Sequence, residues 1–438
     1  MTDPDLRHPA GGLHWAWVVA SVSFATLVGA AAFRSVPGVL MDPLHMEYGW
    51  SHGTIGLAVS VNMVLFGLIS PFAAALMDRF GIRPVVTFAL LMVALGSALT
   101  VFMTAAWQLV LCWGVLVGVG AGSMSMAFVA TVVNRWFVAR RGLVSGILTA
   151  GNATGQLVFL PVVAWITTQH GWRAAALTTA VAALAVVPLV VLLMRDHPAD
   201  MGLQAYGATA EDPGPPPHQR VGSSAGRALS VLRHAARSRS FWLLAGGFAI
   251  CGATTNGLIA THFIPAAMDH GMPPTTAAGL LAVVGIFDVG GTIASGWFTD
   301  RLDPRLLLLA YYTLRGIGLL VLPSLLAPHT TPGTWVFIIF YGLDWVATVP
   351  PTVMLCRDRF GAEDGPIVFG WVFAAHQIGA SAMAFGAGVV RDHTDSYNPA
   401  FYTGAALCVV AAVLSLSIRR VVPAVVVRRD DVELEPTS

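Results

Sequence analysis

Charged side chains are scarce in this sequence, and lysine is missing altogether. Asp, Glu, Lys and Arg make up only 11% of the 438 residues, against roughly 25% in soluble domains, and the mean hydropathy is +0.71. A soluble globular fold is therefore excluded. The absence of lysine excludes the lysine of a phosphate-binding P-loop and of a Schiff base. ATP-driven and lysine-covalent chemistry within this chain are excluded with them.

Short catalytic and metal-binding motifs are missing as well. The cysteines lie in or at the end of apolar runs and lack the CxxC spacing of zinc or redox sites; they are Cys112, Cys251, Cys356 and Cys408. Neither GxSxG nor HExxH occurs, so hydrolysis has no support. We expect no enzyme activity, no cofactor and no metal. A net charge of +1 with dispersed arginines gives no support for nucleic-acid binding.

Long apolar runs are what the sequence has in quantity. A membrane-spanning helix needs about 20 predominantly apolar residues, and runs of this kind recur along the chain between polar residues. The sequence predicts an all-α membrane protein with twelve transmembrane helices in two six-helix bundles, near residues 14–40, 54–77, 85–104, 108–133, 142–167, 174–194, 241–267, 275–298, 305–327, 334–355, 365–390 and 398–418.

A polar stretch divides the twelve runs into two sets of six. It contains the proline-rich segment 213–217, which cannot cross lipid and is typical of a linker. We therefore predict an N-terminal bundle, a cytoplasmic linker, a C-terminal bundle and a cytoplasmic tail, over residues 1–194, 195–240, 241–420 and 421–438. Within the linker, residues 225–237 alternate Leu and Val with Arg, a pattern that predicts a short helix on the membrane surface.

The arginines predict the orientation, because basic residues in short loops stay on the cytoplasmic side. With a cytoplasmic N-terminus, nearly all of them fall in cytoplasmic segments; Arg173 and Arg391 lie on the opposite side, and Arg34 and Arg315 lie inside helices. Both termini are therefore predicted to be cytoplasmic. The lysine-free composition favours a bacterial inner membrane.

The two halves repeat each other at the level of single residues. The motif that begins at Asp78, after the second run, returns 222 positions later at Asp300, after the eighth. Duplicated halves predict a substrate site at their interface near the middle of the membrane. The residues of this predicted gating motif are Asp78, Arg79, Gly81 and Arg83 in the first half, and Gly296, Asp300, Arg301 and Arg305 in the second.

The DRxGxR element and its second copy resemble the signature loop of the major facilitator superfamily. Within that superfamily the chain resembles the monocarboxylate transporter and oxalate/formate antiporter branch, through the segment 12–17 and the basic loop 134–142. The resemblance implies that Arg34, late in helix one, binds the substrate carboxylate, and that Asp288 in helix eight matches a family aspartate. Thr292 stands where the family has an arginine, and the helix-four arginine of many proton-coupled members is absent.

Four charges are predicted to lie within the membrane: Arg34, Asp288, Arg315 and Asp344. Each costs roughly 2.5 to 3.5 kcal/mol at the centre of a spanning helix, so each needs a partner or a wet cavity. Asp288 and Arg315 fall at one depth on neighbouring helices, which makes a purely structural pair an even alternative to a functional role. Arg34 has no acid at its depth in the first half, and the structural alternative is that it reaches toward the headgroups.

Further polar residues fall on helices expected to face a cavity. Each also has a structural interpretation, as a hydrogen bond between helices, a satisfied core histidine or a packing aromatic. The candidate substrate-binding residues are Arg34, Asn62, Asn152, Gln156, His262, His376 and Tyr341.

The leading hypothesis is a monomeric secondary transporter of small organic anions that works by alternating access. Arg34 binds the carboxylate, and Asp288 or Asp344 carries a co-transported proton, because an anion and a proton together neutralise the cavity enough for the halves to close. The alternatives are carboxylate/carboxylate exchange, export of amphipathic compounds and, outside transport, a membrane sensor. The expected partners are a small carboxylate, protons and membrane lipid.

Overall fold

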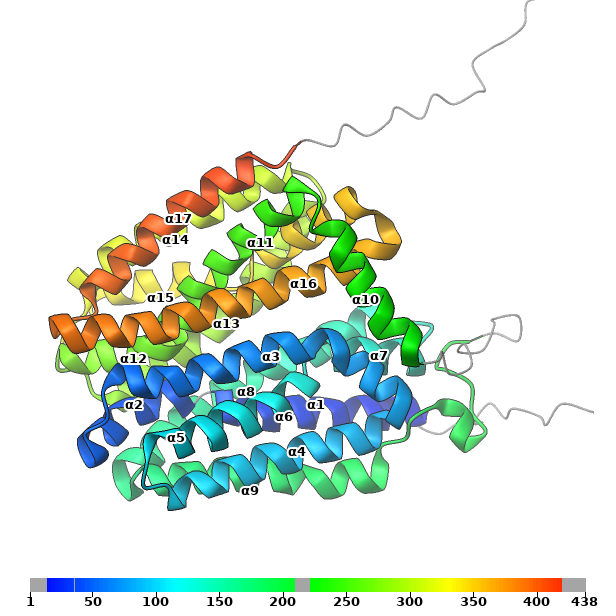
Figure 1. Cartoon of the computed structure of the whole chain (residues 1–438), viewed down its shortest axis with the longest axis horizontal. Coiled ribbons are helices and arrows are strands. Elements are labelled where there is room, and N and C mark those ends of the chain that lie inside the picture. Colours follow the sequence, from blue (N-terminus) through cyan, green and yellow to red (C-terminus); the bar gives the residue numbers. More distant parts are fainter. Residues whose placement is uncertain (1–13, 35, 209–220, 420–438) are drawn as a thin grey trace, which may run out of the picture.

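The computed structural model describes residues 14–34, 36–208 and 221–419. Within them the chain is almost entirely helical, with one isolated bridge between Phe137 and Tyr206. The long helices run along the horizontal axis of Figure 1, and the short helix α10 lies across one end. We call this end the linker end. The opposite end, where α2 leads into α3, is the far end.

The N-terminal bundle contains six rods, where a rod is one helix or a series of consecutive helical segments that crosses the bundle once. The fourth rod contains a π-helical segment, a form that recurs at functional sites. Its elements are α1 (Trp15–Arg34), α2 (Val36–Tyr48), α3 (His52–Phe80), α4 (Ile82–Leu99) with the short turn η1 (Thr100–Phe102), α5 (Ala106–Leu109), the π-helical η2 (Val110–Val117), α6 (Gly118–Ser123), α7 (Met126–Trp136), α8 (Arg141–His170) and α9 (Trp172–Leu193).

The C-terminal bundle repeats this plan, so the described residues form twelve rods. The seventh rod contains a π-helical segment, and the chain turns between the tenth and eleventh rods at Gly361, whose φ is +83°. The elements are α11 (Arg239–Gly252), the π-helical η4 (Ala253–Ile259), α12 (Ala260–Asp269), α13 (Pro274–Thr299), α14 (Pro304–Leu325), α15 (Pro332–Asp344), α16 (Val349–Thr394) and α17 (Asn398–Leu416).

The outer surface of the bundle suits a lipid environment. Ten helical stretches within the described ranges are long and apolar enough to cross a membrane. Large apolar side chains stand exposed on the outward faces of α4, α13 and α17, including Phe88 (63% exposed), Ile293 (70%) and Val409 (64%). A soluble monomer rarely exposes so many large hydrophobic residues. The molecule is a multi-pass membrane protein.

The two bundles meet along α3 and α16, which run side by side in Figure 1. Small residues bring the two backbones close together: an added Cβ at Gly56 would lie 2.6 Å from the Ala384 carbonyl oxygen. The Ser60 hydroxyl donates to the Ser381 carbonyl at 2.6 Å. Close approach through small residues is the usual way in which helices associate within lipid.

The predicted linker helix is present as α10 (Val221–Ala235). It packs against both α3 and α16 at the linker end. The Trp371 indole donates to the Ala228 carbonyl at 3.0 Å, and Arg227 lies 3.4 Å from Asp364. The linker helix therefore touches both bundles where they meet.

Substituting Gly56 by Ala should destabilise the protein, because its Cβ would press on the α16 backbone. Overpacking of this kind costs about 1–3 kcal/mol, and we expect the melting temperature of the purified protein to fall by several degrees. Gly146→Ala on α8 is the matched control, since an added Cβ there meets nothing within 4 Å. Equal effects of the two substitutions would show that the α3–α16 contact does not limit stability.

Candidate functional site

The tenth rod is broken in the middle of the C-terminal bundle. α15 ends at Asp344 and α16 begins at Val349, and the intervening residues form a turn. A break at this depth leaves carbonyl and amide groups without helical partners, and lipid offers none. Side chains from the two neighbouring rods satisfy them.

Arg315 of α14 binds the carbonyl groups at this break. Its Nε donates to Asp344 Oδ2 at 2.6 Å, and its Nη2 donates to the carbonyl oxygens of Asp344 at 2.6 Å and Trp345 at 3.4 Å. Nη1 lies 3.0 Å from the Sγ of Cys251. The Arg315 side chain is fully buried. One guanidinium thus joins three rods and neutralises the carboxylate of Asp344.

Asp288 of α13 binds a backbone amide at the same break. Its Oδ1 accepts from the backbone N–H of Val346 at 3.0 Å and from the Thr292 hydroxyl at 3.1 Å. Both donors are uncharged. In the part of the chain that the structure describes, Asp288 makes no ion pair with an arginine or histidine.

The structural pair of Asp288 with Arg315, which the sequence left as one of two even alternatives, is not the pair that the structure shows. The two residues do lie close to one break, but Arg315 pairs with Asp344. The equal depth of Asp288 and Arg315 on neighbouring helices correctly predicted that the two residues lie near each other. The choice of partner depended on the unwound turn, whose free carbonyls draw the guanidinium toward Asp344, and helix periodicity does not reveal that turn.

A second irregular segment lies beside this break. In η4 the Thr254 carbonyl accepts from the Tyr341 hydroxyl at 2.7 Å. η4 stands 222 positions after the region where α1 ends and α2 begins, so that Asn256 is the counterpart of Arg34. The π-helical segment of the second half thus falls at the position equivalent to the boundary between α1 and α2. Irregular backbone at membrane depth is tolerated where it is buried in protein or lines a cavity.

Three other predicted residues lie in contacts between helices. Asn62 is buried and donates to the Trp113 carbonyl at 2.9 Å. His262 is fully buried, with Nε2 2.8 Å from the Ala384 carbonyl. His376 lies between the rings of Phe248 and Phe373. In this conformation all three serve the packing of helices, which favours their structural interpretation.

The remaining predicted substrate residues are placed by their backbones only. Arg34 is the last residue of α1, and Asn152 and Gln156 lie on α8. The side chains of these three residues, and that of Asp78, lie outside the described part of the structure.

The predicted gating loops tie the third rod of each half to the end of the sixth. Gly81 has a φ of +89° between α3 and α4, and an added Cβ would collide with the Asp196 carboxylate. That carboxylate accepts from the Arg83 amide at 2.9 Å. In the second half, Arg305 donates to the Ile418 carbonyl at 3.0 Å. Asp196 and Ile418 are themselves 222 positions apart, a signal in the sequence that we missed.

The other motif residues are more exposed. Arg79 lies over the Phe80 ring and Arg301 over the Trp297 ring. Asp300 caps the end of α13. An added Cβ at Gly296 would meet nothing within 4 Å, so packing does not require a glycine at this motif position.

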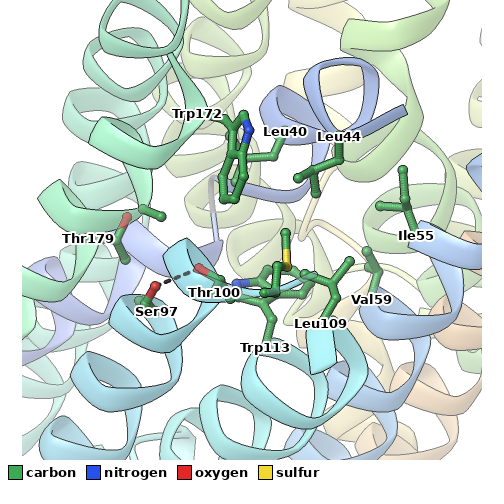
Figure 2. A pocket seen from close by; sticks show the side chains of 12 residues that line it. Leu40, Leu44, Ile55, Val59, Ser97, Thr100, Leu109, Trp113, Trp172 and Thr179 are labelled. Carbon is green, nitrogen blue, oxygen red and sulfur yellow. Dashed lines mark hydrogen bonds between the residues drawn. The ribbon is translucent and has the colours of Figure 1, made fainter. Parts of the chain in front are cut away.

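A pocket lies inside the N-terminal bundle, toward the far end. Figure 2 shows Trp172 and Trp113 on opposite sides of the pocket, with Leu40 and Leu44 of α2 on the side of Trp172. Its walls are mainly apolar, which does not suit an ionised carboxylate. Of the predicted substrate-binding residues whose side chains the structure describes, Asn62, His262, His376 and Tyr341, none lines this pocket.

Comparison with known proteins identifies the family. The family model described as Major Facilitator Superfamily matches residues 22–384. The chain belongs to the Major Facilitator Superfamily. It is therefore a membrane transporter and not an enzyme, as the signature loops and the twelve rods indicate.

Relatives within the superfamily include monocarboxylate transporters. Monocarboxylate transporter 13 of Bos taurus is 28% identical over 406 residues, which cover 91% of this chain and 87% of the relative. Monocarboxylate transporter 11 of Mus musculus is 27% identical, covering 97% and 91%. An uncharacterised MFS-type transporter of Bacillus subtilis (strain 168) is 23% identical, covering 87% and 90%. The predicted resemblance to this branch is confirmed.

Solved structures share the superfamily fold. A bacterial homologue of the human lysosomal transporter Spinster, in an inward-facing and occupied conformation, superposes with a TM-score of 0.70 at 14% identity, covering 93% of this chain and 97% of that one. A D-xylose–proton symporter gives a TM-score of 0.68 at 14% identity, covering 92% and 98%. The predicted two-bundle fold class is confirmed.

Removing one partner of the Arg315–Asp344 pair should destabilise the protein strongly, since it leaves a buried charge uncompensated. We expect Asp344→Ala to cost about 3–5 kcal/mol, measured as a large fall in the melting temperature of the purified protein. Asp288→Asn is the control, because its amide oxygen still accepts from Val346 and Thr292. If Asp344→Ala melts like the wild type, Arg315 does not depend on Asp344.

Proposed function

We propose that this protein is a secondary transporter of small carboxylates, of the monocarboxylate type, that works by alternating access and couples the anion to a proton. The observation that carries the proposal is the pairing of Arg315 with Asp344. This pair neutralises two of the four charges in the membrane. Arg34 and Asp288 remain, and we give them different functions.

Arg34 is the proposed anion-binding residue. It is the last residue of α1, and α2, which begins at Val36, packs against α12 of the other bundle. A guanidinium binds a carboxylate through two parallel hydrogen bonds, and in hydrocarbon it gains more from such a partner than in water. The names of the monocarboxylate transporters among the relatives support a carboxylate as the substrate.

Asp288 is the stronger candidate for the proton. Asp344 already has the positive charge of Arg315 at 2.6 Å, whereas the donors to Asp288 are a hydroxyl and an amide. Thr292 stands where the resemblance implies an arginine, so this aspartate lacks the cation expected one turn away. A proton on Asp288 removes the cost of its negative charge within the membrane.

The charge balance gives the coupling. A carboxylate on Arg34 and a proton on Asp288 leave each half formally neutral in the membrane, and this favours closure of the bundles around the substrate. The distribution of arginines places the linker end on the cytoplasmic side in this proposal. We further propose that the protein lies in a bacterial inner membrane and works as a monomer.

Exchange of one carboxylate for another is the second candidate. The observation in its favour is again Thr292, whose hydroxyl bonds to Asp288 and replaces the family arginine. In an exchanger, Asp288 would stay in one protonation state through the cycle, and only the anion would alternate.

Arg34→Ala should reduce uptake of radiolabelled lactate, acetate and pyruvate into proteoliposomes to background, because the anion loses its counter-charge. Arg173→Ala is the matched control, since Arg173 pairs with Glu47 at the exposed far end. Normal uptake by a well-folded Arg34→Ala protein would eliminate the assigned role.

Asp288→Asn should abolish uptake driven by a pH gradient while leaving counterflow of labelled against unlabelled carboxylate intact, because the amide cannot exchange a proton. In the wild type each anion taken up should bring a proton with it, so the internal pH should fall during uptake; this acidification marks symport. Gradient-driven uptake by Asp288→Asn at the wild-type rate would show that Asp288 does not carry the proton, whereas a wild type that shows counterflow but no gradient-driven uptake would favour exchange.

A further inference from the structure

A histidine lies between two aspartates where the bundles meet at the far end. His52 begins α3 in the first bundle, Asp42 lies on α2, and Asp392 lies on α16 of the second bundle. Nε2 of His52 is 3.1 Å from Asp42 Oδ1, and its Nδ1 is 3.2 Å from Asp392 Oδ1. The His52 side chain is only 8% exposed.

This arrangement requires a proton beyond those of a neutral imidazole and two carboxylates. A neutral imidazole has one N–H donor and one lone pair. With both ring nitrogens against carboxylate oxygens, one nitrogen of a neutral His52 would turn its lone pair toward a negative oxygen. Either the imidazole carries both protons or one carboxyl is protonated, and the proton belongs to the group as a whole.

The contact forms only when the two bundles are closed at this end. Asp392 also accepts from the backbone amides of His52 at 2.8 Å and Gly53 at 2.7 Å, the free donors of the first turn of α3. An added Cβ at Gly388 of α16 would lie 2.6 Å from the His52 carbonyl. Separating α3 from α16 would therefore remove Asp392 from the group and expose His52 to water.

The surroundings of His52 contain other titratable groups, but among the described residues none adds a third carboxylate to Asp42 and Asp392. On α2 the His45 ring lies 4.5 Å from the His52 ring, and its Nδ1 faces the Trp50 carbonyl at 2.7 Å. From the start of α17, the Tyr397 ring lies edge-on at 6.3 Å, between His52 and His262 of α12. On α16, Arg391 is bound by Asp269 and Asp395.

We propose that Asp42, His52 and Asp392 form a proton-binding latch that holds the far end closed. Closure takes up a proton from the far side and reopening returns it to the same side. The latch proton is therefore not carried across the membrane and is separate from the one assigned to Asp288. Acid on the far side favours the closed latch, and its stabilising effect is lost as the pH rises through the titration of the closed group.

Distances between the two halves at the far end test the latch. Spin labels on Gln169→Cys and His329→Cys report the separation by pulsed electron spin resonance, and the native cysteines are buried. The purified protein is studied in detergent without substrate, from about pH 5 to about pH 9. For one proton taken up on closing, the ratio of closed to open molecules should fall by up to about tenfold per pH unit.

His52→Gln should abolish this pH dependence, and Asp42→Asn should weaken it, while His45→Gln keeps the wild-type response because its ring contacts no carboxylate. Asp288→Asn should also keep it. The proposal is overturned if the wild-type distances do not change with pH, if His52→Gln responds like the wild type, or if Asp288→Asn removes the response. Because the measurement involves no solute, any of these results leaves carboxylate transport to be judged by its own assay.

Discussion

A guanidinium can lie in the middle of a membrane protein only where its charge and its donors are satisfied, and Arg315 finds both at the broken tenth rod. The break provides carbonyl oxygens, and Asp344 provides the opposite charge. Asp288 completes the arrangement by accepting from an amide on the other side of the break. Irregular backbone and buried charge thus stabilise each other, and either alone would be costly in this environment.

This arrangement separates structural charge from functional charge. Because Arg315 and Asp344 neutralise each other, the tenth rod can keep its break through the transport cycle. In the proposed mechanism, Arg34 and Asp288 are the groups whose charge state changes when an anion or a proton binds. The two halves are alike in backbone and unlike in charge, since the first rod carries Arg34 where the seventh carries Asn256. An asymmetric site within a symmetric frame suits the alternating access of duplicated bundles.

The fold was largely predictable because the apolar runs and the repeat of 222 positions can be read directly from the order of residues in the chain. The linker helix and the loops after Asp78 and Asp300 followed from local patterns. The site was harder to predict. The partner of Arg315 depended on a local unwinding, and Asn62, His262 and His376 proved to be buried in helix contacts. The latch at His52 joins residues 340 positions apart in sequence, and no periodic pattern brings such residues together.

Proton uptake on substrate binding tests the central claim most directly. Calorimetric titration of the purified protein with lactate, repeated in buffers that differ in ionisation enthalpy, gives the number of protons taken up per bound anion. We expect about one proton per carboxylate near neutral pH, because the anion neutralises Arg34 while Asp288 becomes protonated. Binding with no proton uptake would contradict the coupling of these two charges.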